Sequence, residues 1–257
     1  MRYLLSLLAI ICLCSSSAWA WAAPARTVAP TVPLTNEELF AKARKHMEKP
    51  ETTDVRSLVT LTKQDKQVYW NTRKDKVKLV AFVTDATYFH VAQENVLSAN
   101  LWCFSQKEFE NWYKKHAEMK DIGSDYTLRL HQLTGLAPDA KECMLVTFWV
   151  SPNDVIRPAN VTDVKIDAME AHRANGRVGY QAGSRMFNLK QFQLDPSKHK
   201  GTDKVITRLG YTYDWKNAGH QYGLTEFMVV PFTKVDVETK YGIKGYIKLL
   251  QQKAREQ

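Results

Sequence analysis

Two short segments of the chain are apolar at nearly every position, and this pattern predicts the central strands of a sheet. They read VKLVAFVT, residues 77–84, and CMLVTFWV, residues 143–150. A strand that is covered on both faces has such a pattern, because neither row of its side chains meets water. Two further strands are predicted at LGYTYDW, residues 209–215, and LTEFMVV, residues 224–230, with a turn between them that is rich in glycine and polar residues.

Other segments show the apolar spacing of helices together with helix caps. Thr35 and Glu38 lie three residues apart at the start of one such segment, which is a capping box, and Ser105 with Glu108 repeats the pattern. Gly135 follows the last apolar residue of a third segment, where a glycine commonly ends a helix. The predicted helices cover residues 35–47, 105–119, 124–135 and 240–256, the last of them basic.

The order of these elements predicts an α+β fold. Helices precede and follow the strands without strict alternation, so a mixed, mostly antiparallel sheet with packed helices fits better than a doubly wound one. Hydrophobic residues make up 44% of the chain, enough for one good-sized core. We expect a single α+β domain over residues 35–257, preceded by a Pro-rich linker at residues 23–34.

The first 22 residues predict export. A basic residue, the apolar run YLLSLLAIICLC and small residues such as Ala20 and Ala22 form the pattern of a secretory signal peptide. The apolar run is short for a membrane span. We therefore expect a periplasmic or secreted protein without a transmembrane segment after cleavage, and an uncleaved N-terminal anchor is the alternative.

Two cysteines follow the predicted signal peptide, Cys103 and Cys143. In an oxidising compartment two thiols usually either pair or are buried, and the sequence leaves both alternatives open. Neither has a basic neighbour in sequence that would lower its pKa, so a catalytic thiol is not expected.

The chain is basic, with 36 lysines and arginines, 27 acidic residues and a net charge of +9. The densest basic segment lies at residues 62–78. Anionic partners such as lipid headgroups or cell-wall polymers would be attracted to such a surface, while a solvated basic face is the simpler explanation. No helix-turn-helix, zinc-finger or RNA-recognition pattern accompanies the charge, so no specific nucleic-acid partner is expected.

The predicted hairpin at residues 209–230 concentrates aromatic and charged side chains. In an extended chain Tyr211, Tyr213 and Trp215 point to one side and Asp214 to the other. Glu226, on the returning strand, falls on an otherwise apolar row. A charge there costs several kcal/mol unless it meets a cation or several hydrogen-bond donors.

Arg208 is the nearest cation in sequence to this carboxylate, and Arg157 is another candidate. One interpretation is structural: a buried ion pair and core aromatics that make the hairpin rigid. The other is a ligand pocket, in which aromatic faces hold a ring while Arg208, Asp214 and Glu226 bond its polar edges. The sequence lacks the short motifs of metal, nucleotide and serine-hydrolase sites. Its seven histidines show no HExxH or HxH spacing, and neither a Walker loop nor a G-x-S-x-G motif occurs. We therefore expect no metal and no cofactor.

Three segments carry a family resemblance: LRLHQLTGLAPDA, VTFWVSPNDVIRPANVTD and TRLGYTYDWKNAGHQYGLTEFMV. They resemble a family of uncharacterised exported bacterial proteins with W-V-x-P, R-P and L-G-Y-T-Y-D-W motifs followed by a Glu-Phe strand. In that family Cys often follows R-P, where this chain has Ala159, so any bridge made there is absent. The resemblance covers most of residues 77–235 and transfers no activity. It implies that five residues belong with the hairpin: Trp149, Pro152, Arg157, Pro158 and Asp163. It favours Arg157 as a partner of Asp214 or Glu226.

The leading hypothesis is a periplasmic or envelope protein that binds a small polar or anionic ligand at the hairpin. The candidate ligand-binding residues are Arg157, Asp163, Arg208, Tyr211, Tyr213, Asp214, Trp215 and Glu226. An alternative is a hydrolase or transferase acting at a sugar-like carbon, with Glu226 as the essential carboxylate and Asp214 as the second acid. A third is a structural protein that acts through its basic surface.

Overall fold

In the computed structural model the described residues are 33–118, 122–167, 169, 179–182, 185–188, 204–216 and 222–256. The predicted signal peptide and most of the predicted linker lie outside these residues. Leu34–Gln257 forms one compact unit. Its architecture is α+β, as the order of elements predicted.

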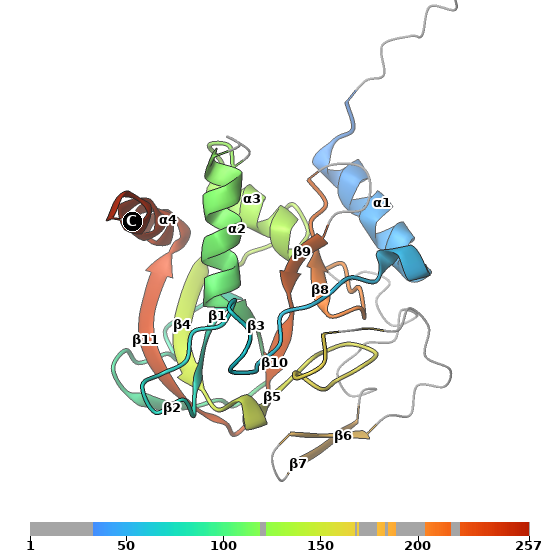
Figure 1. Ribbon diagram of the computed structural model, residues 1–257. Helices are drawn as coiled ribbons and strands as arrows, with labels where there is room; N and C mark the ends of the chain where they lie inside the picture. The colour runs from blue at the N-terminus through green and yellow to red at the C-terminus, as the bar shows by residue number, and fades with distance from the viewer. Residues whose placement is uncertain are drawn as a thin grey trace, which may run out of the picture. The chain divides into compact units, whose positions relative to one another are not determined.

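A seven-stranded sheet forms the centre of this unit, in the order β2-β11-β4-β1-β3-β10-β5. Every neighbouring pair in it is antiparallel. The strands are β1 Val77–Val83, β2 Glu94–Val96, β3 Leu101–Ser105, β4 Met144–Val150, β5 Val155–Ile156, β10 Phe227–Val229 and β11 Lys234–Gly242. The two segments predicted to be central, β1 and β4, pair with each other along their full length in the middle of the sheet (Figure 1).

Two hairpins stand outside the main sheet. β6 Gly179–Ala182 pairs with β7 Arg185–Asn188, and β8 Tyr211–Tyr213 pairs with β9 Tyr222–Thr225. The segment predicted as one strand over residues 224–230 is therefore two strands, β9 and β10, which belong to different sheets. Glu226 lies between them, and its backbone N–H donates to the carbonyl of Gly210 at 2.9 Å.

Helix ends follow the local signals in the sequence. The described helices are α1 Asn36–Glu48, α2 Gln106–Glu118, α3 Tyr126–Thr134 and α4 Ile243–Glu256, with short 3-10 turns at Thr52–Asp54 and Pro152–Asp154. The capping box of Thr35 and Glu38 is present at the start of α1, and Gly135 ends α3 in the left-handed conformation, with a φ of 71°. α4 begins three residues later than predicted, because β11 pairs with β4 as far as Gly242.

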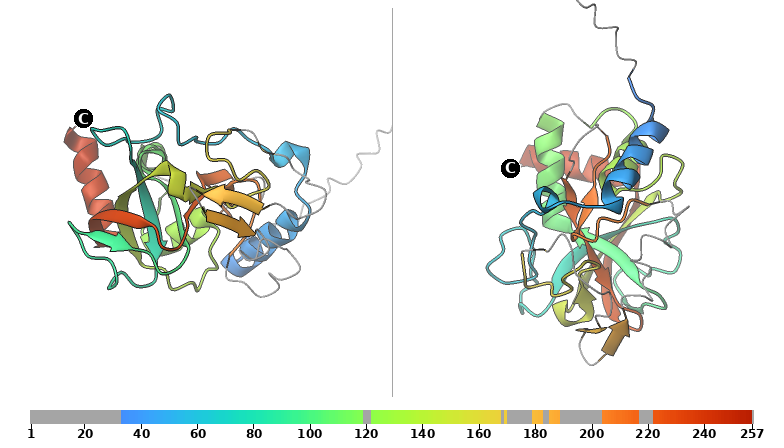
Figure 2. Two further views of the ribbon diagram at one scale, coloured as in Figure 1. Left: turned by 90° about the horizontal axis from the view of Figure 1, so that it is seen from below. Right: turned by 90° about the vertical axis from the view of Figure 1, so that its right-hand side faces the viewer.

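The two faces of the main sheet are covered differently. Val80, Phe104 and Leu145 point to the face on which α2, α3 and α4 pack. Leu79 and Phe148 point to the opposite face, which is covered by the segments around residues 59–68 and 86–97. α1 lies apart from α4, at the opposite end of the described domain (Figure 2), and packs on the β8–β9 hairpin.

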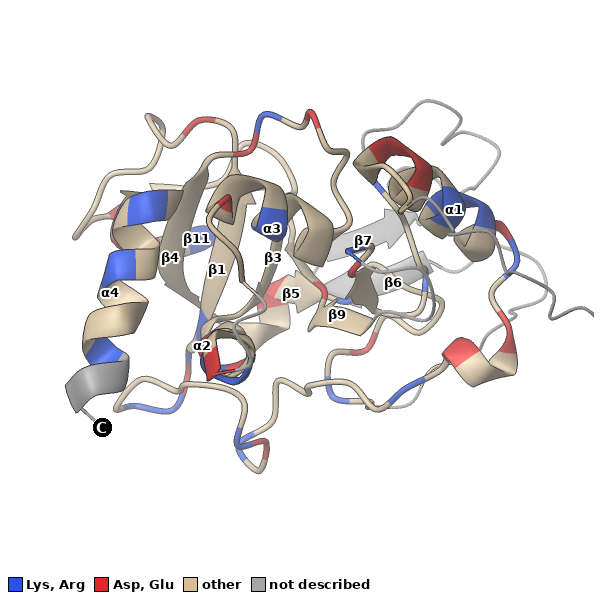
Figure 3. Ribbon diagram, turned by 90° about the horizontal axis from the view of Figure 1, so that it is seen from above, with Lys and Arg blue, Asp and Glu red and all other residues tan. Residues whose placement is uncertain are grey.

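Basic side chains are distributed over several elements rather than gathered in one place (Figure 3). In the basic segment at residues 62–78, Lys76 pairs with Asp236 and Lys78 with Glu238. Lys244 and Lys248 on α4 are exposed. Part of the predicted basic cluster is thus neutralised by β11, which runs on the far side of β4.

Cys103 and Cys143 do not form a disulfide; both are free cysteines. Cys103 is buried on β3, whereas Cys143 is exposed just before β4, and these strands lie on opposite sides of β1. Neighbouring strands lie about 4.8 Å apart, so the two Cα atoms are separated by at least about 10 Å, beyond the roughly 7 Å that a disulfide can join. Burial raises the pKa of the Cys103 thiol, which fits the alternative of a buried, inert cysteine.

No helix in the described part of the chain has both the length and the apolar character needed to cross a membrane.

Candidate functional site

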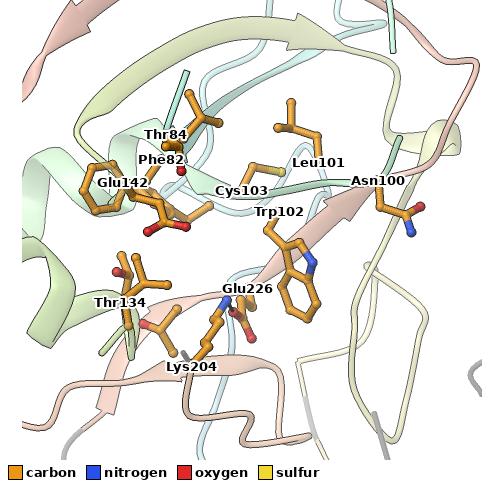
Figure 4. A pocket seen from close by; sticks show the side chains of 14 residues that line it. Phe82, Thr84, Asn100, Leu101, Trp102, Cys103, Thr134, Glu142, Lys204 and Glu226 are labelled. Carbon is orange, nitrogen blue, oxygen red and sulfur yellow. Dashed lines mark hydrogen bonds and ion pairs between the residues drawn. The ribbon is translucent and has the colours of Figure 1, made fainter. Parts of the chain in front are cut away.

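A cavity of about 310 Å³ opens at one end of β1 and β3, beside the β8–β9 hairpin (Figure 4). Its volume is at the lower end of the range usual for small-molecule sites. The lining residues come from seven separate parts of the chain: Phe82, Val83, Thr84, Asn100, Leu101, Trp102, Cys103, Phe104, Thr134, Leu136, Glu142, Lys204, Thr212 and Glu226.

Glu226 forms an ion pair with Lys204 on the wall of this cavity. Glu226 is only 3% exposed, because the chain there passes from the hairpin into the main sheet. The Lys204 ammonium lies 4.1 Å from the centroid of the Trp102 ring, an arrangement that attracts a cation to the ring face. The sequence correctly pointed to a cation beside Glu226, but the cation is Lys204 and not Arg208 or Arg157.

Glu142 brings a second carboxylate to the cavity, on a different wall from Glu226 (Figure 4). Its backbone carbonyl accepts a hydrogen bond from Nε2 of His131 at 2.9 Å, which fixes the chain just before β4. The Glu142 side chain is half-buried, and it makes no hydrogen bond or ion pair with any described residue. The described residues of the lining thus contribute two carboxylates and one ammonium.

Asp214, the other candidate carboxylate, does not line the cavity. Arg129 on α3 holds it in a two-pronged ion pair, with Nη1 to Oδ1 at 3.0 Å and Nη2 to Oδ2 at 2.7 Å. Both residues are buried, and the Arg129 guanidinium also lies 4.8 Å from the centroid of the Trp112 ring. This pair joins α3 to the hairpin, so it has the geometry of the structural alternative.

The three aromatic residues that were predicted as ligand contacts, Tyr211, Tyr213 and Trp215, lie in the protein core. Tyr211 donates its hydroxyl hydrogen bond to the Asp54 carbonyl at 2.9 Å, and Trp215 donates from Nε1 to the Leu136 carbonyl at 2.8 Å. Tyr213 lies with its hydroxyl 3.1 Å from Nδ1 of His46. All three rings are at most 4% exposed, so they pack α1 and neighbouring loops against β8 instead of facing the cavity.

The remaining predicted site residues also lie away from the cavity. Arg157 is fully buried and donates from Nη2 to the carbonyls of Val59 and Ile166, each at 3.0 Å; burial lowers its pKa to about 10. Arg208 donates to the carbonyl of Met47 at 2.8 Å, at the C-terminal end of α1. Asp163 is exposed and accepts the backbone hydrogen bond of Lys165 at 2.8 Å.

The hairpin glycines give room to protein atoms, not to a ligand. A Cβ at Gly223 would lie 2.5 Å from the Leu133 carbonyl oxygen, and one at Gly210 would lie 2.7 Å from Cδ of Arg157. Gly210 also has a φ of 81°, which side chains rarely adopt. Both glycines therefore let the hairpin approach α3 and the buried arginine closely.

Glu108 is a buried carboxylate whose role the sequence did not indicate. Its spacing from Ser105 predicted a capping box, but its side chain accepts hydrogen bonds from the Thr225 backbone N–H at 3.1 and 3.0 Å and from the Thr225 hydroxyl at 3.0 Å. Arg56 lies 3.5 Å from Oε1. Burial raises the pKa of Glu108 to about 7, although the Thr225 backbone hydrogen bond and Arg56 oppose this rise. Glu108 thereby fixes the residue that precedes Glu226.

The sequence missed Trp102, Glu142 and Lys204 as site residues. They are separated by 40 and 62 positions in the printed numbering, and no local spacing links them. Only the pairing of β3 with β1 and β10, together with the return of the chain at Lys204 beside Leu136, brings them to one cavity. Of the predicted site residues, Glu226 alone lines it.

Comparisons with known proteins give no relative for this chain. A scan against protein-family models, a search of curated proteins and a search of solved structures each found no match. The family resemblance of the three sequence motifs therefore stays a prediction. Among the residues that the structure describes, no group of three or more His, Cys, Asp or Glu side chains is arranged to hold a metal ion.

Proposed function

We propose that this protein binds a small polar organic molecule in the cavity between β3, the end of β1 and the β8–β9 hairpin. The observation that carries the proposal is the ion pair of the buried Glu226 with the partly buried Lys204 on the cavity wall, with the ammonium against the face of Trp102. Placing a carboxylate and an ammonium beside a cavity costs desolvation free energy. A ligand that these groups orient would account for their position.

The rest of the lining has the composition of a ligand site. Phe82, Leu101 and Leu136 supply apolar surface. The hydroxyl groups of Thr134 and Thr212 are already bonded within the protein, each donating to a carbonyl of α3 at 2.7 Å, so the polar groups open to a ligand are the charged ones. Mostly apolar walls with a few converging polar groups are the common arrangement in small-molecule sites. The exposed residues Thr84 and Asn100 form the rim, through which a ligand can enter.

A ligand screen with two tryptophan variants tests this function. Amino acids, amines, sugars and nucleosides are added to the full chain, and the melting temperature is measured. A ligand at 100 times its Kd should raise the free energy of unfolding by about 2.7 kcal/mol. Trp102→Ala should abolish the shift, whereas Trp149→Ala should keep it, because Trp149 is a partly buried residue on β4 that stacks with Lys78 outside the cavity.

Two outcomes would overturn the proposal. One is that no compound raises the melting temperature of the parent chain. The other is that a shift survives both Trp102→Ala and Glu226→Gln, since binding would then take place elsewhere.

A second candidate function is hydrolysis or transfer at a sugar-like carbon. The observation that favours it is the presence of two carboxylates, Glu142 and Glu226, in one cavity. Such reactions use a pair of acids with different roles, and these two differ in burial and partners: Glu226 is buried beside Lys204, while Glu142 is half-buried without a described partner. Asp214, the second acid expected from the sequence, is held by Arg129.

Turnover of aryl glycosides tests this candidate separately from binding. If it is correct, Glu226→Gln and Glu142→Gln should each lower kcat by at least about 100-fold, while a bound ligand is retained. If the parent chain binds a ligand but hydrolyses none of the aryl glycosides, the catalytic candidate is ruled out and the proposed binding function stands.

Export is also part of the proposed function, on the support of the signal-peptide pattern at residues 1–22. Expression in a Gram-negative host, followed by fractionation and mass determination, tests it. A mature chain in the periplasm or medium that has lost about 20 residues is the expected result. A full-length chain in the cytoplasm would contradict it.

A further inference from the structure

We infer that the ligand of this cavity carries a protonated amine, which the carboxylate of Glu142 binds, on an otherwise apolar body. The inference rests on the proposed binding function and specifies the chemical class of its ligand. It differs from the sequence-based expectation, which included anionic ligands.

The charge balance of the lining favours a cation. Lys204 and Glu226 offset one another, since they form an ion pair. Glu142 then leaves the described part of the lining with one excess negative charge. An anion would be repelled by this excess charge, and repulsion is stronger at a partly buried site than in water. A cation would face one carboxylate that has no described partner.

The burial of Glu142 makes it the accessible member of the two carboxylates. Glu226 is only 3% exposed and already in contact with an ammonium, whereas Glu142 is half-buried. A half-buried carboxylate is open to a molecule from solution, and it is sheltered enough for a charge-assisted hydrogen bond to matter. The side chain of Glu142 therefore has the properties of an anchor for an incoming amine.

Lys204 itself demonstrates that this cavity suits an alkylammonium group. Its ammonium lies 4.1 Å from the centroid of the Trp102 ring and in contact with Glu226. The same two kinds of group, an aromatic ring and a carboxylate, recur on the other side in Phe82 and Glu142. Cations are held well by such combinations. We therefore place the ligand amine near Glu142 and its carbon body against Phe82 and Leu101.

Three compounds with one carbon framework and different head groups provide the direct test: 2-phenylethylamine, 2-phenylethanol and phenylacetate. Binding of each to the full chain is measured by calorimetry at pH 7, and the same three head groups are repeated on butyl and cyclohexylmethyl frameworks. The amine should bind at least about tenfold more tightly than the alcohol, because a charge-assisted hydrogen bond contributes more than a neutral one. The acid should bind most weakly.

Glu142→Gln should remove the preference for the amine, so that the amine and the alcohol bind with similar affinity. The matched control is Glu118→Gln, which neutralises an exposed carboxylate at the end of α2, outside the cavity. It should keep the tenfold preference. Raising the salt concentration should lower the affinity for the amine more than the affinity for the alcohol, since only the amine binds through its charge.

The possible results separate this inference from the function on which it rests. An alcohol that binds as tightly as the amine, or an acid that binds best, would overturn the amine inference while binding in the cavity stands. A preference that survives Glu142→Gln would assign the amine to another group and overturn the role of Glu142. If no member of the three series binds, the amine inference falls, and the broader ligand screen decides whether the cavity binds anything else.

Discussion

The β8–β9 hairpin and the cavity beside it contain the same kinds of residue, but they use them differently. In the hairpin, Tyr211, Trp215 and Asp214 are buried, and each polar group has a protein partner. In the cavity, Trp102 is partly buried and the Glu142 carboxylate has no partner among the described residues. Aromatic and charged residues therefore do not identify a site by themselves; what distinguishes the two regions is whether the polar groups are already satisfied.

The distinction has an energetic basis. A buried polar group costs free energy unless it is bonded, so a fully bonded hairpin contributes stability and offers little to a ligand. A half-buried carboxylate at a cavity keeps its bonding capacity for a molecule from solution. We thus expect substitutions in the hairpin to change stability and substitutions in the cavity to change binding.

Arg129→Met should give the largest loss of stability. It leaves Asp214 as a buried carboxylate without its two hydrogen bonds of 3.0 and 2.7 Å, which costs about 3–5 kcal/mol. The double variant Arg129→Met, Asp214→Leu should lose less than the single variant, because no buried charge remains. Urea unfolding measures both. A single variant within about 1 kcal/mol of the parent would contradict the structural role of the pair.

Glu108 should make stability depend on pH. Its pKa is raised from 4.5 to about 7 in the folded chain, so between these values the folded state binds more protons than the unfolded state. Stability from this group is therefore complete below about pH 4.5 and falls as the pH rises through 7, by up to about 3 kcal/mol.

The variant Glu108→Gln should lack this slope, so the parent should lose stability relative to it between pH 4.5 and 8. Glu118→Gln, at an exposed position, is the control and should follow the parent. Parallel curves for the parent and Glu108→Gln would show that the carboxylate is not desolvated.

Gly223→Ala should destabilise the hairpin by about 1–3 kcal/mol. Its Cβ would lie 2.5 Å from the Leu133 carbonyl oxygen, so backbone must shift. Gly245→Ala on α4 is the matched control, because the nearest atom to its Cβ is Cδ1 of Tyr241 at 3.5 Å. That variant should be neutral or more stable by about 0.5 kcal/mol, since alanine favours a helix. Equal melting temperatures of the two variants would contradict the close approach of β9 to α3.

Tyr213→Phe should cost about 1 kcal/mol, the usual contribution of one hydrogen bond. The hydroxyl lies 3.1 Å from Nδ1 of His46, and burial raises its pKa to about 12, so it stays protonated in ordinary buffers. Ligand affinity in the cavity should not change. A variant that kept its stability and lost ligand binding would place Tyr213 in the site after all.

Glu142→Gln should have the smallest effect on stability, within about 0.5 kcal/mol. No described residue depends on its carboxylate, although its backbone carbonyl bonds to His131. The same variant is expected to weaken binding of an amine. Glu142 would then affect binding without affecting stability, the opposite of what is expected for the hairpin residues. A loss of several kcal/mol in urea unfolding would instead make Glu142 a structural residue.

The central strands and helix ends could be predicted because their signals are local. β1 and β4 are apolar on both faces, and both faces are covered; Thr35 and Gly135 act within one turn of the helices they cap. The local signal at Ser105 and Glu108 was incomplete, because tertiary contacts directed the Glu108 side chain to Thr225.

The candidate site could be predicted only in part, because it is assembled from distant residues. Glu226 was identifiable as a charge on an apolar row, which raises the question of its partner. That the partner is Lys204, and that Glu142 and Trp102 face the same cavity, follows from strand order together with the bridge between Leu136 and Lys204. The hairpin aromatics drew attention because they are close in sequence, yet that closeness reflects packing against α1.

The position of β11 in the sheet has a consequence for the synthesis of this chain. β4 is a central strand, but one of its two neighbours, β11, is the last of the seven strands of this sheet to be made, and β10, on the far side of β3, is almost as late. A ribosome must therefore pass Gly242 before the backbone groups on that edge of β4 can pair. Until then the growing chain presents a long apolar edge, which is a template for aggregation. Truncation before residue 234 should thus yield an insoluble product rather than a smaller folded domain.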